Sequence, residues 1–171
     1  LVRIGQTIRE SFECSDLIEY TTEANPGTVT KEHLTAWQQM GINRVSLGLQ
    51  SAVNEELSML GRIHTYEQFL ETYHQVRESG IDNINVDVMA AIPGQTMESY
   101  QKTLRRIVKL QPEHISSYSL IVEPGTVFGD WEENGSLNRP NEETDRAMYQ
   151  WTKRFLDENG YHRYEVSNYA H

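Results

Sequence analysis

The sequence has very little cysteine: Cys14 is the single thiol among 171 residues. One cysteine excludes an internal disulfide framework, and we expect a reducing, cytoplasmic setting. The Cys-x-x-Cys and His-x-x-x-His spacings of protein-built zinc sites are also missing, so we expect no metal site of that kind. No pattern of His and Asn surrounds Cys14, which predicts an inert helical residue rather than a nucleophile.

Basic side chains are also scarce. The 15 lysine and arginine residues are outnumbered by 25 acidic ones, which gives a formal net charge of −10. This balance argues against nucleic acid or an anionic membrane as the main partner. There is no apolar run long enough to span a bilayer and no signal-peptide pattern, so we expect no membrane span. Glycine-rich dinucleotide and Walker loops are absent too, which disfavours Rossmann and P-loop folds.

Strand-like and helix-like patterns alternate along the chain, joined by short loops. The expected strands are 17–24, 42–50, 83–92, 114–122 and 161–169. A first expected helix contains Ile4, Ile8 and Phe12. The other expected helices are 30–40, which could begin at 28 instead, 53–60, 65–79, 95–110 and 141–159. Residues 128–140 are expected to form an irregular segment. This alternation predicts parallel strands connected by right-handed helical crossovers.

One face of each expected strand is polar, whereas the other is largely apolar. The polar faces carry Glu19, Thr21, Glu23, Arg44, Ser46, Gln50, Asn85, Asp87, Ser117 and Ser119. A doubly wound sheet would bury both faces of its central strands, whereas a barrel places helices outside and a polar lumen inside. We therefore expect an α/β fold, an incomplete parallel (β/α) barrel, because a complete one takes about 250 residues. We expect residues 1–171 to form a single domain truncated at both ends.

Four polar residues fall at or near the carboxyl ends of the expected strands, where parallel-strand folds bind ligands. They are Glu23, Gln50, Arg62 and Asp87. Two carboxylates, an amide and a guanidinium around one cavity suit a zwitterion, with the acids facing an ammonium or ribose hydroxyls and Arg62 facing a carboxylate. One alternative is a structural network in which Arg62 or Arg44 neutralises the two acids. A weaker one is a metal-dependent aldolase or hydrolase barrel that uses Glu23 and Asp87.

Ordered blocks of sequence cover nearly the whole chain and carry a specific resemblance. They are Glu23–Gly27, Gly41–Ser51, Leu60–Arg62, Asn85–Thr96, Ile115–Leu120, Glu123–Thr126 and Tyr164–Ala170. The chain resembles the oxygen-independent coproporphyrinogen III oxidase-like radical S-adenosylmethionine (radical SAM) proteins, the HemN/HemW-like family. It is most similar to the HemW branch, whose members are regarded as heme chaperones. The resemblance implies an incomplete barrel of the radical SAM type.

The resemblance also implies roles for the strand-end residues. In the family, the positions that match Glu23, Gln50, Arg62 and Asp87 line the S-adenosylmethionine pocket. The cofactor binds a [4Fe-4S] cluster, and its reductive cleavage yields a 5′-deoxyadenosyl radical. In the oxidase branch this radical starts oxidative decarboxylation of two propionates of coproporphyrinogen III. The implied partners are therefore S-adenosylmethionine, a porphyrinogen or heme, and an electron donor.

One departure from the family pattern concerns the cluster. The family's Cys-x-x-x-Cys-x-x-Cys motif is absent from this chain, and we expect it upstream of Leu1. Three thiolates are needed, so we expect this chain alone to be inactive, with no cluster ligands. The function of the complete protein stays open between a porphyrinogen oxidase and a heme chaperone, and the block Tyr164–Ala170 favours the chaperone.

Overall fold

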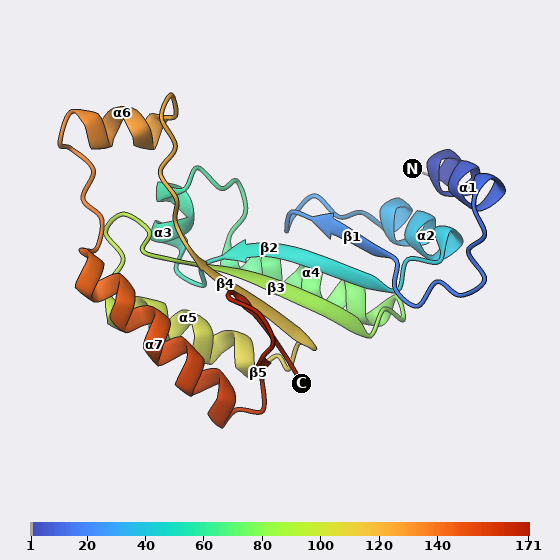
Figure 1. Cartoon of the computed structure of the whole chain (residues 1–171). Coiled ribbons are helices and arrows are strands. Elements are labelled where there is room, and N and C mark those ends of the chain that lie inside the picture. The colour runs from blue at the N-terminus through green and yellow to red at the C-terminus, as the bar shows by residue number, and fades with distance from the viewer. Residues whose placement is uncertain (1) are drawn as a thin grey trace.

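The computed structural model describes residues 2–171 and contains a six-stranded sheet in the order β1-β2-β3-β4-β6-β5 (Figure 1). The strands are β1 (Thr21–Ala24), β2 (Arg44–Gln50), β3 (Asn83–Ala90), β4 (His114–Ser119), β5 (His162–Arg163) and β6 (Asn168–Ala170). The helices are α1 (Val2–Ser11), α2 (Lys31–Met40), α3 (Asn54–Met59), α4 (Tyr66–Glu78), α5 (Met97–Val108), α6 (Val127–Glu133) and α7 (Glu142–Glu158).

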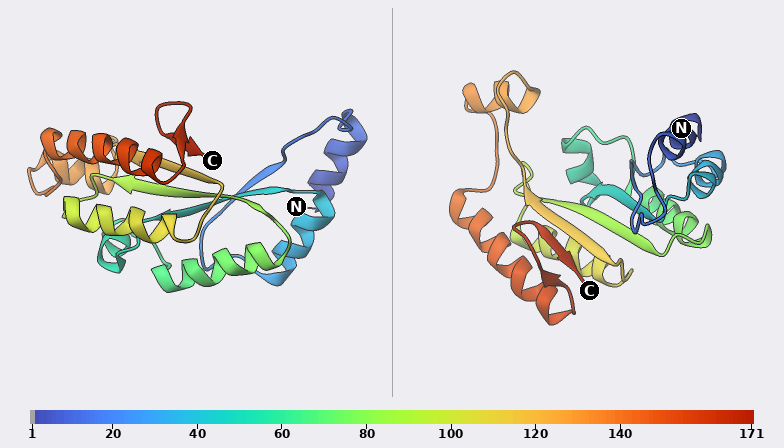
Figure 2. Two further views of the ribbon diagram at one scale, coloured as in Figure 1. Left: turned by 90° about the horizontal axis from the view of Figure 1, so that it is seen from below. Right: turned by 45° about the vertical axis from the view of Figure 1, so that its right-hand side comes forward.

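Strands β1 to β4 pair in parallel, in chain order, as the alternation of strands and helices predicts. The curved sheet carries α4, α5 and α7 along its outer side (Figure 2). Since every connection between the parallel strands passes through a helix, the carboxyl ends of β1, β2 and β3 meet at one edge.

The last part of the sheet differs from expectation. The prediction of a single strand over 161–169 is wrong, because this stretch folds into a hairpin of β5 and β6. The hairpin is closed by a 3.3 Å hydrogen bond from the backbone N–H of Tyr164 to the carbonyl of Asn168. Strand β6 pairs antiparallel with β4, with Tyr169 opposite Ile115. A chain that returns through a short turn needs no helical crossover, so it enters the sheet in the opposite direction.

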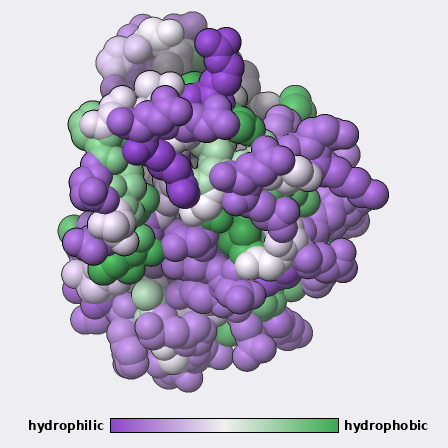
Figure 3. Space-filling view, turned by 90° about the vertical axis from the view of Figure 1, so that its right-hand side faces the viewer, coloured by the Kyte–Doolittle hydropathy of each residue, from purple (hydrophilic) through white to green (hydrophobic). Residues whose placement is uncertain are grey.

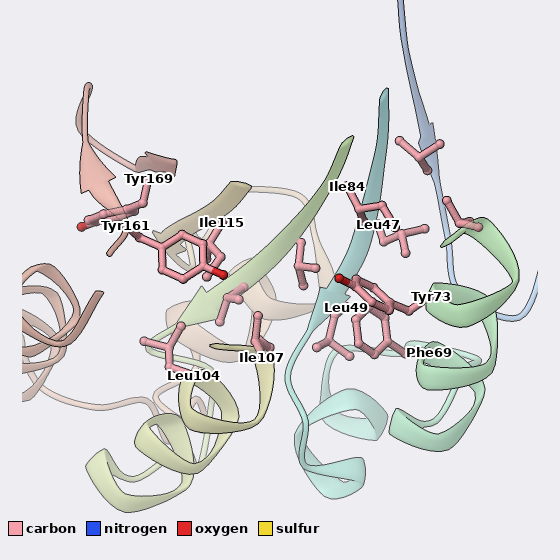
Figure 4. Packing of buried hydrophobic residues seen from close by; sticks show 14 of the residues in the cluster. Leu47, Leu49, Phe69, Tyr73, Ile84, Leu104, Ile107, Ile115, Tyr161 and Tyr169 are labelled. Carbon is pink, nitrogen blue, oxygen red and sulfur yellow. The ribbon is translucent and has the colours of Figure 1, made fainter. Parts of the chain in front are cut away.

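The core lies between the sheet and its outer helices (Figure 4). The apolar faces predicted for β2 and β3 are completely buried: Leu47 and Ile84 have no exposed surface. Phe69 and Tyr73 from α4 and Leu104 from α5 pack in the same cluster. Truncation of such a buried leucine to alanine typically costs about 2–5 kcal/mol, so this layer holds the strands in register.

The helix termini follow the capping signals in the sequence. Thr65 and Gln68 form the predicted capping box, in which each side chain accepts a hydrogen bond from the other residue's backbone N–H. Thr30 rather than Thr28 caps α2, and Gly41 ends it at a left-handed φ of 73°. Asn141 caps α7 through the backbone N–H of Thr144. These caps set where each helix begins, and thus the lengths of the adjoining loops.

Several expected boundaries are wrong, most by one or two residues and three of them with more effect on the description of the chain. Strand β1 begins at Thr21 rather than at residue 17, and β4 ends at Ser119 rather than at residue 122. Helix α1 ends at Ser11, so Cys14 lies in the following loop as a free, partly exposed thiol. The two strand ends coincide with the ends of their partners, because Thr21 pairs with Arg44, the first residue of β2, and Ser119 pairs with Ala90, the last residue of β3.

The stretch 128–140, expected to be irregular, begins with helix α6. The Thr126 hydroxyl accepts a 3.1 Å hydrogen bond from the backbone N–H of Gly129, which caps this helix. The rings of Phe128 and Trp131 lie 5.5 Å apart on it. Because the helix has only seven residues, its apolar pattern is too short to reveal a helical period.

The surface is mainly polar on the side of β1 and α2, where hydrophobic residues form separate small patches (Figure 3). Among residues 2–171, no helix combines the length and the apolar character required to cross a membrane.

Candidate functional site

A cavity of about 570 Å³ at the carboxyl ends of β1, β2 and β3 brings together the four residues singled out from the sequence. Glu23, Gln50, Arg62 and Asp87 all line it. They come from three neighbouring strands and from the loop after α3, so their proximity depends on the parallel order of the sheet. Ligand sites of parallel-strand folds lie at this edge.

Asp87 is held by its neighbours on the inner face of the sheet. Its Oδ1 accepts a 2.7 Å hydrogen bond from Asn85 Nδ2, and its Oδ2 accepts a 3.1 Å bond from the Ser46 hydroxyl. Ser46 and Asn85 face each other in the register of β2 and β3. Each carboxylate oxygen accepts one of these bonds from a neutral donor, so Asp87 has acceptor positions left for a ligand.

Gln50 ends β2 in an unusual backbone conformation. Its φ is 71°, in the left-handed region, and the register of β2 against β3 shifts between Leu47 and Gln50. Residues other than glycine rarely adopt this φ, because the conformation costs them on the order of 1–3 kcal/mol. Strain of this kind concentrates at ligand sites, and here it occurs at a residue that is only 3% exposed and lines the cavity.

Gly48 keeps the cavity open beside Gln50. A methyl group at this position would lie 3.1 Å from Gln50 Nε2 and 3.6 Å from Asn25 Oδ1. Asn25 in turn accepts a long hydrogen bond of 3.5 Å from Arg62 Nη1, and the Arg62 backbone N–H donates to the Leu57 carbonyl at 2.9 Å. Because Gly48 has no side chain, it leaves room in the cavity between the Gln50 amide and the Arg62 guanidinium.

No direct ion pair among the described residues supports the structural-network alternative. Within residues 2–171, no ion pair of 4 Å or less joins Arg62 or Arg44 to Glu23 or Asp87. Arg44 instead lies 3.8 Å from Glu19. The arginines that this alternative requires therefore make no direct ion pair with the two acids of the cavity.

Tyr118 is a cavity residue that the sequence reading missed. The sequence pattern predicts Ser117 and Ser119 on the inner face of β4, but the strand lies one residue out of that phase. Ser117 forms a 2.8 Å hydrogen bond with the Tyr100 hydroxyl, and Ser119 donates a 2.6 Å hydrogen bond to Asp145. Tyr100 and Asp145 lie on the outer helices α5 and α7. Since side chains alternate along a strand, Tyr118 then faces the cavity.

A signal for the correct phase was present in the strand. Ile115 is its one aliphatic side chain and is completely buried against the outer layer. Residues of even number, His114, Ser116 and Tyr118, must then face inward. The register agrees, because Ser116 pairs with Asp87 and Tyr118 pairs with Met89.

The Tyr118 hydroxyl donates a 3.1 Å hydrogen bond to Gln50 Oε1. Burial raises the pKa of Tyr118, and the negative charge of Asp87 raises this pKa further. The hydroxyl therefore stays protonated at neutral pH and continues to donate. With Oε1 engaged in this way, Gln50 has its Nε2 donor left for the cavity.

The metal-binding alternative has no ligand set to support it. Over residues 2–171, no three His, Cys, Asp or Glu side chains are grouped so that they could hold a metal ion. The same observation means that the described residues do not fit a [4Fe-4S] cluster, which is held by several cysteine thiolates.

The comparisons with known proteins agree with the fold and identify the class. Residues 5–107, more than half of the chain, match the Radical SAM superfamily, and the chain belongs to this superfamily of radical SAM enzymes. The coproporphyrinogen III oxidase HemN from Escherichia coli superimposes with a TM-score of 0.83 at 24% identity, over 98% of this chain and 38% of that one. The fold is accordingly a partial radical SAM (β/α) barrel.

Sequence relatives narrow the assignment. The heme chaperone HemW of Lactococcus lactis is 37% identical over 99% of this chain, and that of Bacillus subtilis is 37% identical over 91%. A mitochondrial radical S-adenosyl methionine domain-containing protein 1 from Danio rerio is 38% identical over 99%. The protein is thus of the HemN/HemW-like radical SAM family. The chain spans 45%, 41% and 38% of the lengths of these three relatives.

Proposed function

We propose that the cavity binds S-adenosylmethionine through Glu23, Gln50, Arg62 and Asp87. Arg62 pairs with the carboxylate of the methionyl group. Glu23 and Asp87 accept hydrogen bonds from its ammonium group and from the ribose hydroxyls, and Gln50 donates from its amide. The proposal rests on the chemistry of these side chains, in which two carboxylates that accept hydrogen bonds lie beside one guanidinium that donates them.

Two further observations support this assignment. The cavity volume of about 570 Å³ lies within the usual range for small-molecule sites. The methyl-free position at Gly48 leaves room for a ligand beside the Gln50 amide. Each feature concerns shape rather than charge, and together they match an extended nucleoside amino acid better than a small ion.

The part of the reaction that we assign to this chain is binding and orientation of the cofactor. When bound, S-adenosylmethionine supplies a sulfonium centre whose reductive cleavage starts radical chemistry. Arg62 would hold the carboxylate of the methionyl group, and the two acids would hold its ammonium group and the ribose hydroxyls, which would orient the cofactor in the cavity. Because residues 2–171 do not fit an iron–sulfur cluster, no electron-transfer step is assigned to them.

Isothermal titration of the 171-residue chain with S-adenosylmethionine and with S-adenosylhomocysteine tests the proposal. We expect binding, and we expect Asp87→Asn to weaken it roughly 10- to 100-fold, the usual effect of losing a hydrogen bond to a charged group. Glu19→Gln is the matched control, because this acid lies near β1 but does not line the cavity. Binding that is absent, or unchanged in Asp87→Asn, contradicts the assignment.

For the complete protein we propose a role in heme handling. The relatives at 37% identity are named heme chaperones, whereas the oxidase is similar at the level of the fold. The segment Tyr164–Ala170, which resembles the chaperone branch, forms the turn of the hairpin and strand β6, which pairs with β4. Porphyrinogen oxidation with an electron donor is the competing activity.

A pair of assays on the product of the complete reading frame separates these activities. Heme is titrated by absorbance, and propionate decarboxylation is measured anaerobically with coproporphyrinogen III, a reductant and S-adenosylmethionine. Stoichiometric heme binding without decarboxylation is the expected result. Turnover of coproporphyrinogen III contradicts the chaperone role and favours the oxidase.

A further inference from the structure

A continuous chain of hydrogen bonds runs beneath the cavity from the C-terminal hairpin to Asp87. Tyr164, in the turn between β5 and β6, bonds through its hydroxyl to His114 Nε2 at 2.6 Å. His114 Nδ1 bonds to Asn85 Oδ1, and Asn85 Nδ2 donates to Asp87 Oδ1 at 2.7 Å. Asn85 and His114 are almost completely buried, at 2% and 7% exposed.

The carboxylate sets the direction of every bond in this chain. An ionised Asp87 only accepts, so Asn85 must present its Nδ2 donor to it, and the same NH₂ group donates to the Ser46 hydroxyl at 2.7 Å. Asn85 Oδ1 must then face His114, where it also accepts a 3.1 Å bond from the Ser116 hydroxyl. The reverse orientation of the amide would set its oxygen against the carboxylate.

The tautomer of His114 follows from the same constraint. Since Asn85 Oδ1 only accepts, His114 Nδ1 must carry a proton, and in a neutral imidazole Nε2 is then an acceptor. Tyr164 must therefore donate its hydroxyl proton to Nε2. The two rings meet edge to face, with centroids 5.5 Å apart, which fixes the imidazole plane as well.

The charges around His114 favour the neutral ring. Burial lowers the pKa of His114, and the positive charge of Arg44 on β2 lowers it further. Three acids oppose this shift: Asp87 on β3, Glu19 before β1 and Glu165 in the hairpin turn. The net direction is downward, in agreement with the geometry.

We propose that Asn85, His114 and Tyr164 are positioning residues that hold Asp87 as an oriented acceptor for the cofactor and couple the hairpin to the site. The role for the cofactor rests on the proposed function, whereas the direction of the hydrogen bonds does not. The hairpin brings Tyr164 to this place because β6 pairs with β4, with Ala170 opposite His114. Loss of the Tyr164 hydroxyl at the hairpin thus loosens Asp87, which lies three hydrogen bonds away.

Two measurements test the proposal, and the first uses the isotopically labelled 171-residue chain. Long-range ¹H–¹⁵N spectra at neutral pH report the tautomer of His114, assigned by the loss of its signals in His114→Gln. We expect the proton on Nδ1, a result that does not depend on any ligand. A proton on Nε2 alone overturns the proposed direction.

Titration of S-adenosylmethionine into Tyr164→Phe tests the positioning role. We expect the dissociation constant to rise about three- to tenfold, the usual effect of losing one hydrogen bond, with unchanged circular dichroism. Tyr164→Leu, which also removes the ring, should weaken binding at least as much. Tyr66→Phe is the control, because this tyrosine on α4 lines neither the cofactor cavity nor the hydrogen-bond chain, and its ring contacts survive the loss of the hydroxyl.

The possible failures are distinguishable. If the unaltered chain binds no S-adenosylmethionine, the proposed function fails, and the tautomer still decides whether the hydrogen-bond chain exists. If the unaltered chain binds the cofactor and both Tyr164 variants bind it equally well, the positioning role is overturned while the proposed function stands.

Discussion

The hydroxyl of Tyr118 donates a 3.1 Å hydrogen bond to Oε1 of Gln50, and so joins β4 to β2 across the intervening strand β3. The two residues lie 68 positions apart in the sequence. The bond holds the amide at the point where the backbone of Gln50 adopts its left-handed conformation. Orientation of a cavity donor therefore depends on a residue from a different strand.

Tyr118→Phe should weaken binding of S-adenosylmethionine without unfolding the protein. The substitution removes one neutral hydrogen bond, worth about 0.5–1.5 kcal/mol, which corresponds to roughly a two- to tenfold rise in the dissociation constant. Isothermal titration measures it, with Tyr66→Phe as the control. Equal affinity for both variants would mean that Gln50 needs no such support.

Glu56→Ala should be strongly destabilising. This buried carboxylate, 6% exposed, accepts hydrogen bonds from Ser51 at 2.6 Å, Gln95 at 2.9 Å and Ser99 at 2.5 Å. It ties the loop after β2 to the start of α5, and its removal leaves buried donors without partners. We expect a loss of about 3 kcal/mol in the free energy of unfolding by urea.

The neighbouring acid provides the control for this prediction. Glu55 lies on the same helix turn and is exposed, so Glu55→Ala should change the free energy of unfolding by less than about 0.5 kcal/mol. Similar losses for the two variants would show that the hydrogen bonds of Glu56 add little net stability.

Gly129→Ala should destabilise α6, although alanine in a helix is normally about 1 kcal/mol better than glycine. The added methyl group would lie 2.5 Å from the carbonyl oxygen of Glu123, a backbone atom that cannot turn away. Hydrogen exchange of the α6 amides should therefore accelerate. Glu133→Ala, an exposed change in the same helix, should leave exchange slow; slower exchange in Gly129→Ala would contradict the clash.

Stability should fall as the pH is lowered through the histidine range. Burial lowers the pKa of both His64 and His114 below the ordinary value of 6.5. Below pH 6.5 the unfolded chain therefore binds protons that the folded chain does not. The stability is fully present above this value and is lost progressively as the pH falls through the folded-state pKa values.

Urea unfolding from about pH 7.5 to about pH 5.5 measures this dependence. His64→Gln should flatten it, because His64 is 4% exposed and its Nε2 lies 3.3 Å from the Leu49 carbonyl oxygen. The exposed His74 serves as the control, and His74→Gln should leave the slope unchanged. A slope that His64→Gln does not alter would place the pH dependence elsewhere.

Much of this fold was determined by local sequence patterns. The capping box at Thr65, the helix end at Gly41 and the alternation around Ile84 each depend on residues a few positions apart, and the structure confirms all three. Even the grouping of Glu23 with Asp87 was predictable. Parallel strands joined by helices necessarily present their carboxyl ends at one edge.

Only the tertiary structure decided which face of β4 points inward and how the chain closes. Both faces of β4 carry hydroxyl groups, so the single aliphatic side chain of Ile115 is a weak local sign of the phase, and the register against β3 selects Tyr118 over Ser117. The antiparallel return of β6, which brings Tyr164 to His114, likewise depends on pairing between segments far apart in sequence. Local propensity carries no information about such partners, because their free energy arises only when the sheet assembles.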